Sequence, residues 1–283
     1  MPVSESHDAW IRKAVDGDEE SLEKLIESTQ DDIYNLALRF LWNPSDAEDA
    51  TQEILIRIIT HLANFRRECN FSTWVYRIAT NYLINTKKRA LEQQELTFEV
   101  FEAGIKAGLT PGTRVTFPEA DRDLLAQELK VSCTHAMLLC LDRENRLIYI
   151  LSAIFRVKSQ EGAFIMDMTP EVYRKRWSRI REKMRNFMEN NCGLVNKNKT
   201  CSCHRRIEVA IENRRINPEH LLFTNRPAGE NRFITDCINE MEHFDAAAAA
   251  FAGNPFYLAP ESIHAKIATL LCSRKYRIIE DLS

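Results

Sequence analysis

Apolar residues recur three and four positions apart through most of the chain, which is the spacing of one face of an α-helix. The stretch that begins NPSDAEDATQ shows this spacing clearly, with an apolar face of Ala50, Ile54, Ile58, Leu62 and Phe65. Alternating β-branched residues are scarce, and the 283 residues include only eight glycines. The sequence therefore predicts an all-α protein, long enough for about two domains or three small ones.

Two changes of character divide this helical pattern. Residues 91–119 contain Pro111, Gly112 and Pro118 and predict a flexible or partly extended connection. The second change follows Asn190. We expect a first helical domain over 1–92, a linker over 93–119, a second helical domain over 120–190 and a mainly helical extension over 191–283.

The first segment predicts four helices. Asp18 is placed to cap the second, which buries Leu22, Leu25 and Ile26, and Ser72 to cap the fourth. The fourth helix, NFSTWVYRIATNYLINTKKR, is rich in aromatic residues and ends on basic ones. This pattern has two interpretations. It is either a buried stripe with a solvated basic end, or a surface that stacks unpaired bases and neutralises phosphates.

The end of the second domain, KSQEGAFIMDMTPEVYRKRWSRIREKMRNFM, predicts a helix over 159–166, a turn at 167–169 and a long helix from Pro170. Thr169 is the expected N-cap, because Pro170 suits the first turn of a helix. The long helix should bury Tyr173, Trp177, Ile180 and Met184. The opposite side carries Glu171, Arg174, Lys175, Ser178 and Arg179. A helix-turn-helix with a groove-reading second helix fits this pattern, and an ordinary solvated helical hairpin is the alternative.

Charge is distributed unevenly along the chain, although the net charge is only −3. Residues 1–32 carry ten acidic and three basic side chains, whereas residues 170–188 carry seven basic and two acidic ones. A local basic block favours nucleic-acid binding more than the total charge opposes it.

At this point a family resemblance becomes specific. The 36-residue stretch DAEDATQEILIRIITHLANFRRECNFSTWVYRIATN resembles region 2 of the extracytoplasmic-function (ECF) sigma factors of bacterial RNA polymerase. The resemblance implies that Asp49, Gln52 and Glu53 bind core polymerase. It also implies that the following helix melts and holds the −10 strand of the promoter. The residues implied in that contact are Phe71, Ser72, Thr73, Trp74, Arg77, Asn81, Lys87 and Lys88.

The helix-turn-helix resembles region 4 of the same family, so residues 1–190 match a two-domain sigma factor. This implies that Arg174, Lys175, Ser178 and Arg179 contact the −35 element as duplex DNA. Two residues depart from the family pattern. Asp167 replaces the usual glycine of the turn, and Trp177 replaces a common leucine. Asp167 is expected either to distort the turn or to adopt a left-handed conformation.

The resemblance implies a cytoplasmic, non-enzymatic promoter-specificity subunit whose partners are core polymerase, promoter DNA and a candidate anti-sigma factor. The alternative is a stand-alone helix-turn-helix regulator with a metal- or thiol-sensing C-terminal domain. No apolar run approaches the ~18 residues of a membrane span. No phosphate loop or nucleophile motif is present.

The extension resembles that of a subgroup of these factors and carries a cysteine cluster. Cys192, Cys201, Cys203 and His204 could hold a structural zinc ion, although their spacing is not that of a common zinc finger. A thiol switch and plain reduced thiols are the other two interpretations. No cofactor is required by the predicted function. We expect the extension to regulate transcription by packing across region 4 and the linker.

Overall fold

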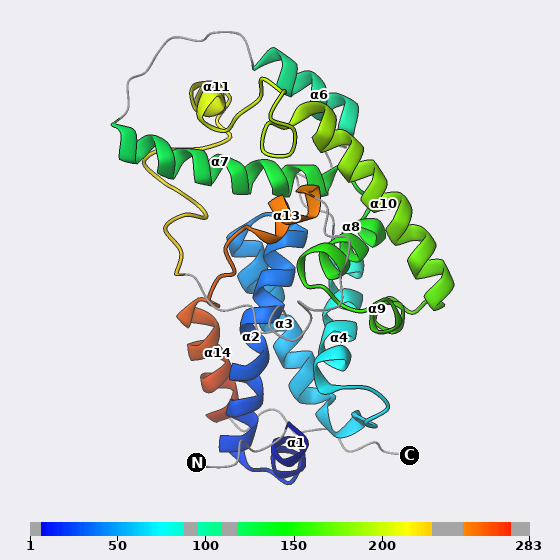
Figure 1. Cartoon of the computed structure of the whole chain (residues 1–283). Coiled ribbons are helices and arrows are strands. Elements are labelled where there is room, and N and C mark those ends of the chain that lie inside the picture. Colours follow the sequence, from blue (N-terminus) through cyan, green and yellow to red (C-terminus); the bar gives the residue numbers. More distant parts are fainter. Residues whose placement is uncertain (1–6, 88–95, 109–117, 228–245, 273–283) are drawn as a thin grey trace, which may run out of the picture. The chain divides into compact units, whose positions relative to one another are not determined.

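The computed structural model describes residues 7–87, 96–108, 118–227 and 246–272 (Figure 1). These ranges contain α-helices, short helical turns and loops, and no β-strand. The predicted all-α class is therefore confirmed. None of the helices in these ranges is long and apolar enough to cross a membrane.

The chain forms two compact units, each built from segments that are distant in sequence. Unit 1 contains residues up to Thr86, the segment Ala163–Met168 and the residues from Tyr257 onward. Unit 2 contains Lys87–Gly162 and Thr169–Phe256. The extension is thus divided, with its first part in unit 2 and its last part in unit 1.

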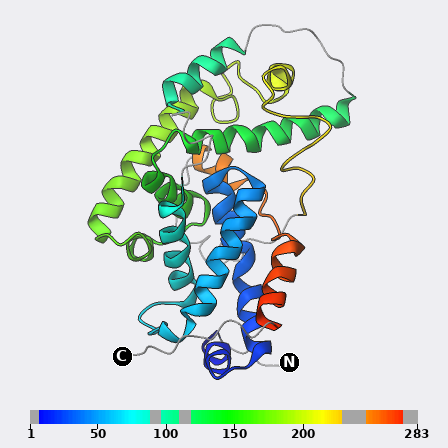
Figure 2. The same cartoon turned by 180° about the vertical axis from the view of Figure 1, so that it is seen from behind.

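Unit 1 is a helical bundle. Its helices are α1 (His7–Val15), α2 (Glu19–Leu41), α3 (Pro44–Thr60), the 3-10 turn η1 (Leu62–Asn64), α4 (Phe71–Asn85) and α14 (Glu261–Cys272). Ile33, Leu36 and Phe40 of α2 are fully buried. The last helix, α14, packs against α3, and both views show it alongside α2 (Figures 1 and 2).

Local sequence sets most of the helix boundaries in unit 1. Asp18 caps α2 as predicted, because its Oδ2 accepts a hydrogen bond from the Ser21 N–H at 2.9 Å. Asn43 caps α3 in the same way through Asp46 N–H at 3.1 Å. The prediction that Ser72 caps α4 is wrong, because the helix already begins at Phe71 after Asn70. Phe71 is only 6% exposed, so its burial favours the earlier start.

The first helix of unit 2 among the described residues lies in the predicted linker. Residues 98–107 form helix α6 (Phe98–Ala107), capped by Thr97, whose hydroxyl accepts from the Val100 N–H at 3.3 Å. Phe98, Phe101 and Ile105 recur at helical spacing and are buried, and the Phe98 ring lies 4.9 Å from that of Phe187. The expectation of an extended connection is therefore wrong for this part of the linker, while residues 109–117 lie outside the described ranges.

The rest of unit 2 is also helical. It contains α7 (Glu119–Leu139), α8 (Arg143–Tyr149), the wide π-helical turn η2 (Ile150–Ile154), α10 (Pro170–Asn191), η3 (His204–Arg206), α11 (Ile207–Glu212) and α13 (Ala246–Ala252). Helix α9 (Ser159–Ile165) begins in unit 2, and its last residues belong to unit 1.

The predicted helix-turn-helix elements are present at 159–191. The Thr169 hydroxyl accepts from the Val172 N–H at 3.3 Å, and Pro170 occupies the first turn of α10. Asp167 has a φ of 52°, so the left-handed conformation expected as one of two options is the one adopted, with aspartate in place of glycine. Tyr173 is fully buried and its hydroxyl lies 2.7 Å from Ser152 Oγ. A Cβ on Gly162 would approach the Tyr173 ring to 2.4 Å, which explains the glycine there.

Candidate functional site

The acidic face of α3 is formed by residues on the side of the helix opposite its core. Ala47, Ala50, Ile54 and Ile58 are buried in the bundle. Asp49 and Glu53, one turn apart, are both exposed. Gln52 is half-buried, and its amide nitrogen lies inside without a hydrogen-bond partner among the described residues. These three side chains thus form a polar surface on a rigid helix, which suits a protein partner.

An aromatic cluster occupies the start of α4. The Trp74 ring stacks on Phe71 at a centroid distance of 5.9 Å and an interplanar angle of 28°, and lies 5.3 Å from Phe65. Phe65 and Phe71 are buried, whereas Trp74 is half-exposed. The helix therefore builds core through one side and leaves one aromatic ring half-exposed on the other. Stacking of unpaired bases on this ring stays a prediction.

The other predicted DNA-binding residues of α4 differ in accessibility. Thr73 is 5% exposed and, like Phe71, cannot reach a DNA strand in this conformation. Ser72 is half-exposed, and Asn81 and Lys87 are exposed. Lys88 lies outside the described residues.

Arg77 is already engaged within unit 1. Its Nη2 lies 2.7 Å from Asp167 Oδ1, and its Nη1 donates to the Phe164 carbonyl at 3.2 Å. The guanidinium also lies 4.7 Å from the centre of the Phe164 ring. Asp167, at the position where the family usually has glycine, is thus the ion-pair partner of Arg77. DNA contact by Arg77 would require exchange of these partners for phosphate.

The outward face of α10 carries the basic residues of the helix-turn-helix. Arg174, Lys175, Ser178 and Arg179 are all exposed, as predicted from their spacing. Lys175 pairs with Glu171 one turn earlier at 2.9 Å, and Arg176 pairs with Glu144 of α8. Arg174 and Arg179 form no ion pair with any residue that the structure describes. These two guanidinium groups are accessible for a base edge or a phosphate.

The structure separates one member of the predicted zinc set from the rest. Cys192, Cys201 and Cys203 are half-buried thiols without a disulfide. His204 is exposed, and its Nε2 lies 2.8 Å from Asp123 Oδ1. In the part of the chain that the structure describes, no three metal-binding side chains are already arranged around a common ion position. Cys133 of α7, which sequence spacing did not single out, lies near the three extension thiols.

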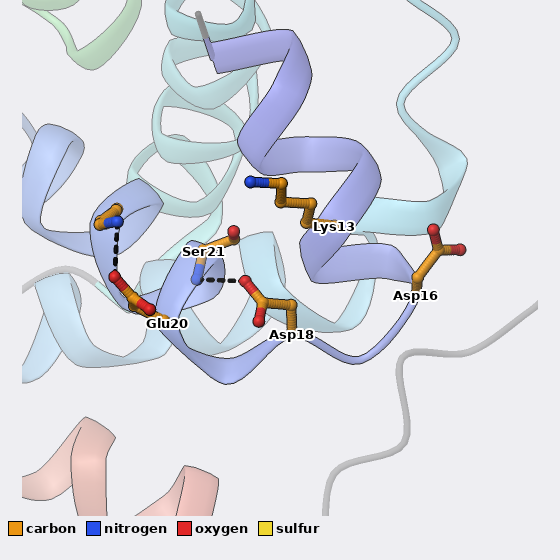
Figure 3. Close-up of a pocket in the computed structure, with 6 residues that line it drawn as sticks. Lys13, Asp16, Asp18, Glu20 and Ser21 are labelled. Carbon is orange, nitrogen blue, oxygen red and sulfur yellow. Dashed lines mark hydrogen bonds and ion pairs between the residues drawn. The ribbon is translucent and has the colours of Figure 1, made fainter. Parts of the chain in front are cut away.

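An open pocket of about 580 Å³ lies between α1 and α2 and is lined by Lys13, Asp16, Asp18, Glu20, Ser21 and Lys24 (Figure 3). Three of its polar side chains form hydrogen bonds or ion pairs within α2 and its N-cap. Asp18 caps α2, and hydrogen bonds from Ser21 lower the pKa of its carboxyl group. Lys24 and Glu20 form an ion pair at 2.7 Å within α2. The pocket therefore belongs to the local architecture of the bundle.

Comparison with known proteins agrees with this arrangement. Residues 25–92 match the family model of Sigma-70 region 2, which spans α3 and α4. The chain is 30% identical over 176 residues to the ECF RNA polymerase sigma factor SigW of Bacillus subtilis. That match covers 62% of this chain and 92% of SigW. It is 27% identical over 186 residues to the ECF RNA polymerase sigma-E factor of Escherichia coli, covering 63% of this chain and 92% of that protein.

These matches leave more than a third of the chain uncovered, yet they span nearly all of each relative. The surfaces of α3 and α4 lie inside the region 2 match. Sigma factors are transcription initiation factors without catalytic activity, which agrees with the absence of an enzyme motif in the sequence. The chain belongs to the ECF RNA polymerase sigma factors.

Proposed function

We propose that this chain binds core RNA polymerase through Asp49, Gln52 and Glu53 of α3 and directs it to promoters. In this proposal α4 holds the melted −10 strand and α10 enters the major groove of the −35 element. The chain would therefore act where polymerase acts, in the bacterial cytoplasm. An anti-sigma factor that controls it stays a prediction.

The observation that carries the proposal is the pairing of two surfaces inside the region 2 match. An exposed acidic pair lies on α3, and a half-exposed tryptophan supported by buried rings lies on the next helix. Melting a promoter requires a partner that keeps unpaired bases out of the duplex stack, and each extrusion costs a few kcal/mol. An aromatic ring held rigidly by its neighbours offsets part of this cost by stacking.

Family membership favours this function over the stand-alone regulator, because a regulator needs no polymerase face and no strand-holding helix. The direct test is in-vitro transcription with purified core polymerase. The chain should make initiation promoter-specific, whereas core polymerase alone should not initiate there. Duplex DNA binding without any stimulation of transcription would favour the regulator instead.

Charge reversal on α3 tests the polymerase contact. We expect Asp49→Lys with Glu53→Lys to weaken core binding by roughly 2–5 kcal/mol. The two introduced positive charges would then face a polymerase surface that is complementary to acidic groups. Fluorescence anisotropy with labelled chain and core polymerase measures the affinity. Asp16→Lys with Glu23→Lys reverses the same number of exposed acidic charges in unit 1 and should bind normally. Equal affinity of both double variants would contradict the assignment.

Alanine substitutions on α10 test the duplex contact. Arg174→Ala and Arg179→Ala should each cost roughly 1–3 kcal/mol of promoter binding if the arginine meets a guanine edge. Lys87→Ala, just after the end of α4, should instead lower affinity similarly for all sequences and reduce the salt dependence. Footprinting of the holoenzyme at several salt concentrations separates the two effects. Arg205→Ala, which removes an exposed arginine outside α10, is the control. An equal loss of promoter affinity in this variant would show that the affinity depends on total positive charge and not on the α10 contact.

A further inference from the structure

A closed loop brings two cysteines of the extension together. Cys192 ends α10, and its N–H donates to the Met188 carbonyl at 2.7 Å. The chain then turns back, so that the Gly193 N–H donates to the Cys201 carbonyl at 2.9 Å. A Cβ at Gly193 would lie 2.3 Å from that carbonyl oxygen. Glycine is therefore required for the close approach, which holds Cys192 and Cys201 at the two ends of one loop.

The position of Cys203 is fixed by the residues around it. Its side chain packs against the apolar cluster of Leu125, Ala126 and Leu129 on α7, which also includes Ile207 and Ala210 of α11. The Cys203 carbonyl accepts from the Arg206 N–H at 3.0 Å. The buried Arg206 guanidinium donates to the carbonyls of Ile105 and Gly104 of α6, at 2.6 and 3.2 Å. The chain after Cys203 is thus tied to two other helices of unit 2.

Cys133 contributes a fourth thiol from α7. It lies one helical turn beyond Leu129 and so on the same side of α7 as the cluster that holds Cys203. Burial raises the pKa of the Cys133 thiol to about 12, and the nearby thiols of Cys203, Cys192 and Cys201 add to this shift. Burial, together with the thiols of Cys192 and Cys201, likewise raises the pKa of Cys203 to about 11. Cys201 is two residues from Cys203, so the Cys192–Cys201 loop, the apolar cluster and α7 bring these four cysteines to one region of unit 2.

The surroundings of these thiols favour metal binding over a thiol switch. None of the four cysteines is in a disulfide, and three separate segments of unit 2 supply them: α7, the end of α10 and the Cys201–Cys203 stretch. A thiophilic cation binds the deprotonated sulfur and releases the proton. His204 turns to Asp123 instead of the thiols.

We propose that Cys133, Cys192, Cys201 and Cys203 form a four-thiolate site for one Zn²⁺ ion, which closes when the thiol side chains turn toward the ion. Four cysteine ligands in tetrahedral geometry are a usual structural zinc set. Turning is required because, as the side chains stand, no three of the described metal-binding groups surround a common point. The site would join α7, the end of α10 and the start of the extension. It does not depend on polymerase or DNA binding.

The test uses the full chain, loaded with Zn²⁺ in reducing buffer and then dialysed. Metal analysis should give one zinc ion per chain, and Co²⁺ loading should give the absorption spectrum of a tetrahedral thiolate site. Cys133→Ser, Cys192→Ser, Cys201→Ser and Cys203→Ser should each lose the ion. His204→Ala, Cys69→Ser and Cys140→Ser should retain it, because His204 faces Asp123 and the other two thiols belong to other surroundings. Affinity should fall as pH falls, because protons compete for the thiolates.

Alkylation mapping on the unaltered chain covers the case in which a serine variant fails to fold. Zn²⁺ should protect the four named cysteines from a thiol reagent and leave Cys69 as reactive as before. A chain that retains no zinc would overturn the proposal, as would protection of a different set. Loss of zinc in His204→Ala, with zinc retained in Cys133→Ser, would also overturn it. That result would show that the fourth ligand is His204, as the sequence spacing suggested, and not Cys133.

Discussion

Replacing Asn35 by alanine will destabilise unit 1 by roughly 3–5 kcal/mol, because the buried amide of Asn35 joins α2 to the segment that begins at Tyr257. Asn35 is fully buried, and its Nδ2 donates to the Tyr257 carbonyl at 2.7 Å. Its Oδ1 accepts from the Tyr257 N–H at 3.0 Å. The same oxygen accepts from Arg39 Nη1 at 2.8 Å. Alanine would leave all of these groups without this partner.

The Arg39 guanidinium makes the loss larger. Arg39 is 3% exposed, and desolvation lowers its pKa to about 10. A buried cation depends on its acceptors, so removal of one acceptor costs more than removal of a neutral hydrogen bond. Beyond Tyr257, the Ala259 N–H donates to Asp31 Oδ1 at 2.8 Å, and Ile263 and Ile267 of α14 are buried. Loosening at Tyr257 should therefore spread to α14.

Urea denaturation measures the destabilisation, and amide hydrogen exchange shows where it acts. The Tyr257 and Ala259 amides should lose protection in Asn35→Ala. Asn81→Ala, which removes an exposed asparagine of α4 in the same unit, should change stability by less than about 0.5 kcal/mol. A small loss in Asn35→Ala with unchanged protection at Tyr257 would show that the end of the chain is not held by this contact.

The Asn35 contact also shows which features the sequence could not predict. The boundaries that depend on adjacent residues were predicted correctly, such as the Asp18 cap of α2 and the Thr169–Pro170 start of α10. A cap needs only a side chain two or three residues from the N–H that it accepts. Asn35 and Tyr257 are separated by 222 positions, and no spacing rule connects them. The extension was expected to pack on region 4 and the linker. Its first part does pack on α7, α10 and α6, whereas its last part packs on α2 and α3.

The two incorrect local predictions both involve buried apolar side chains. Ser72 is a good cap by residue type, yet burial of Phe71 starts α4 earlier. Proline and glycine near 111 suggested an extended linker, yet Phe98, Phe101 and Ile105 find a buried surface and form α6. Packing favours the earlier start of α4, and α6 ends at Ala107, before that proline and glycine. Cys133 was missed because it is far in sequence from the thiols that it approaches in the fold.

Glu128 in unit 2 carries the second large effect, and Glu128→Ala should cost roughly 3–5 kcal/mol. Glu128 is 2% exposed on α7. Its Oε1 accepts from the Leu222 N–H at 2.8 Å, and its Oε2 accepts from the N–H groups of Phe223 and Thr224 at 3.1 and 2.9 Å. The Thr224 hydroxyl lies 3.1 Å from Oε2. Consecutive backbone N–H groups thus surround this buried carboxylate.

Removing the carboxylate would leave the buried N–H of Phe223 and the part-buried N–H groups of Leu222 and Thr224 without this acceptor. It would also release Phe223, which is 1% exposed and stacks on the His135 ring at a centroid distance of 5.2 Å. The effect should therefore concentrate in the NPEHLLF stretch of the extension, where the resemblance to a sigma-factor subgroup gave no mechanism. Urea denaturation should show the loss, and the amides of residues 222–224 should exchange faster while the α4 amides of unit 1 stay protected.

Two further variants separate charge from shape. Glu128→Gln keeps the volume, but only one of its two terminal atoms can accept hydrogen bonds, so it should lose part of the stability that alanine loses. Glu119→Ala removes an exposed carboxylate from the same helix and should be nearly neutral. If Glu128→Gln were as stable as the unaltered chain, the N–H groups would not depend on the second oxygen. If Glu128→Ala were also stable, other contacts with α7 would be enough to hold the extension, such as the apolar contacts of Leu125 and Leu129 and the His204–Asp123 pair.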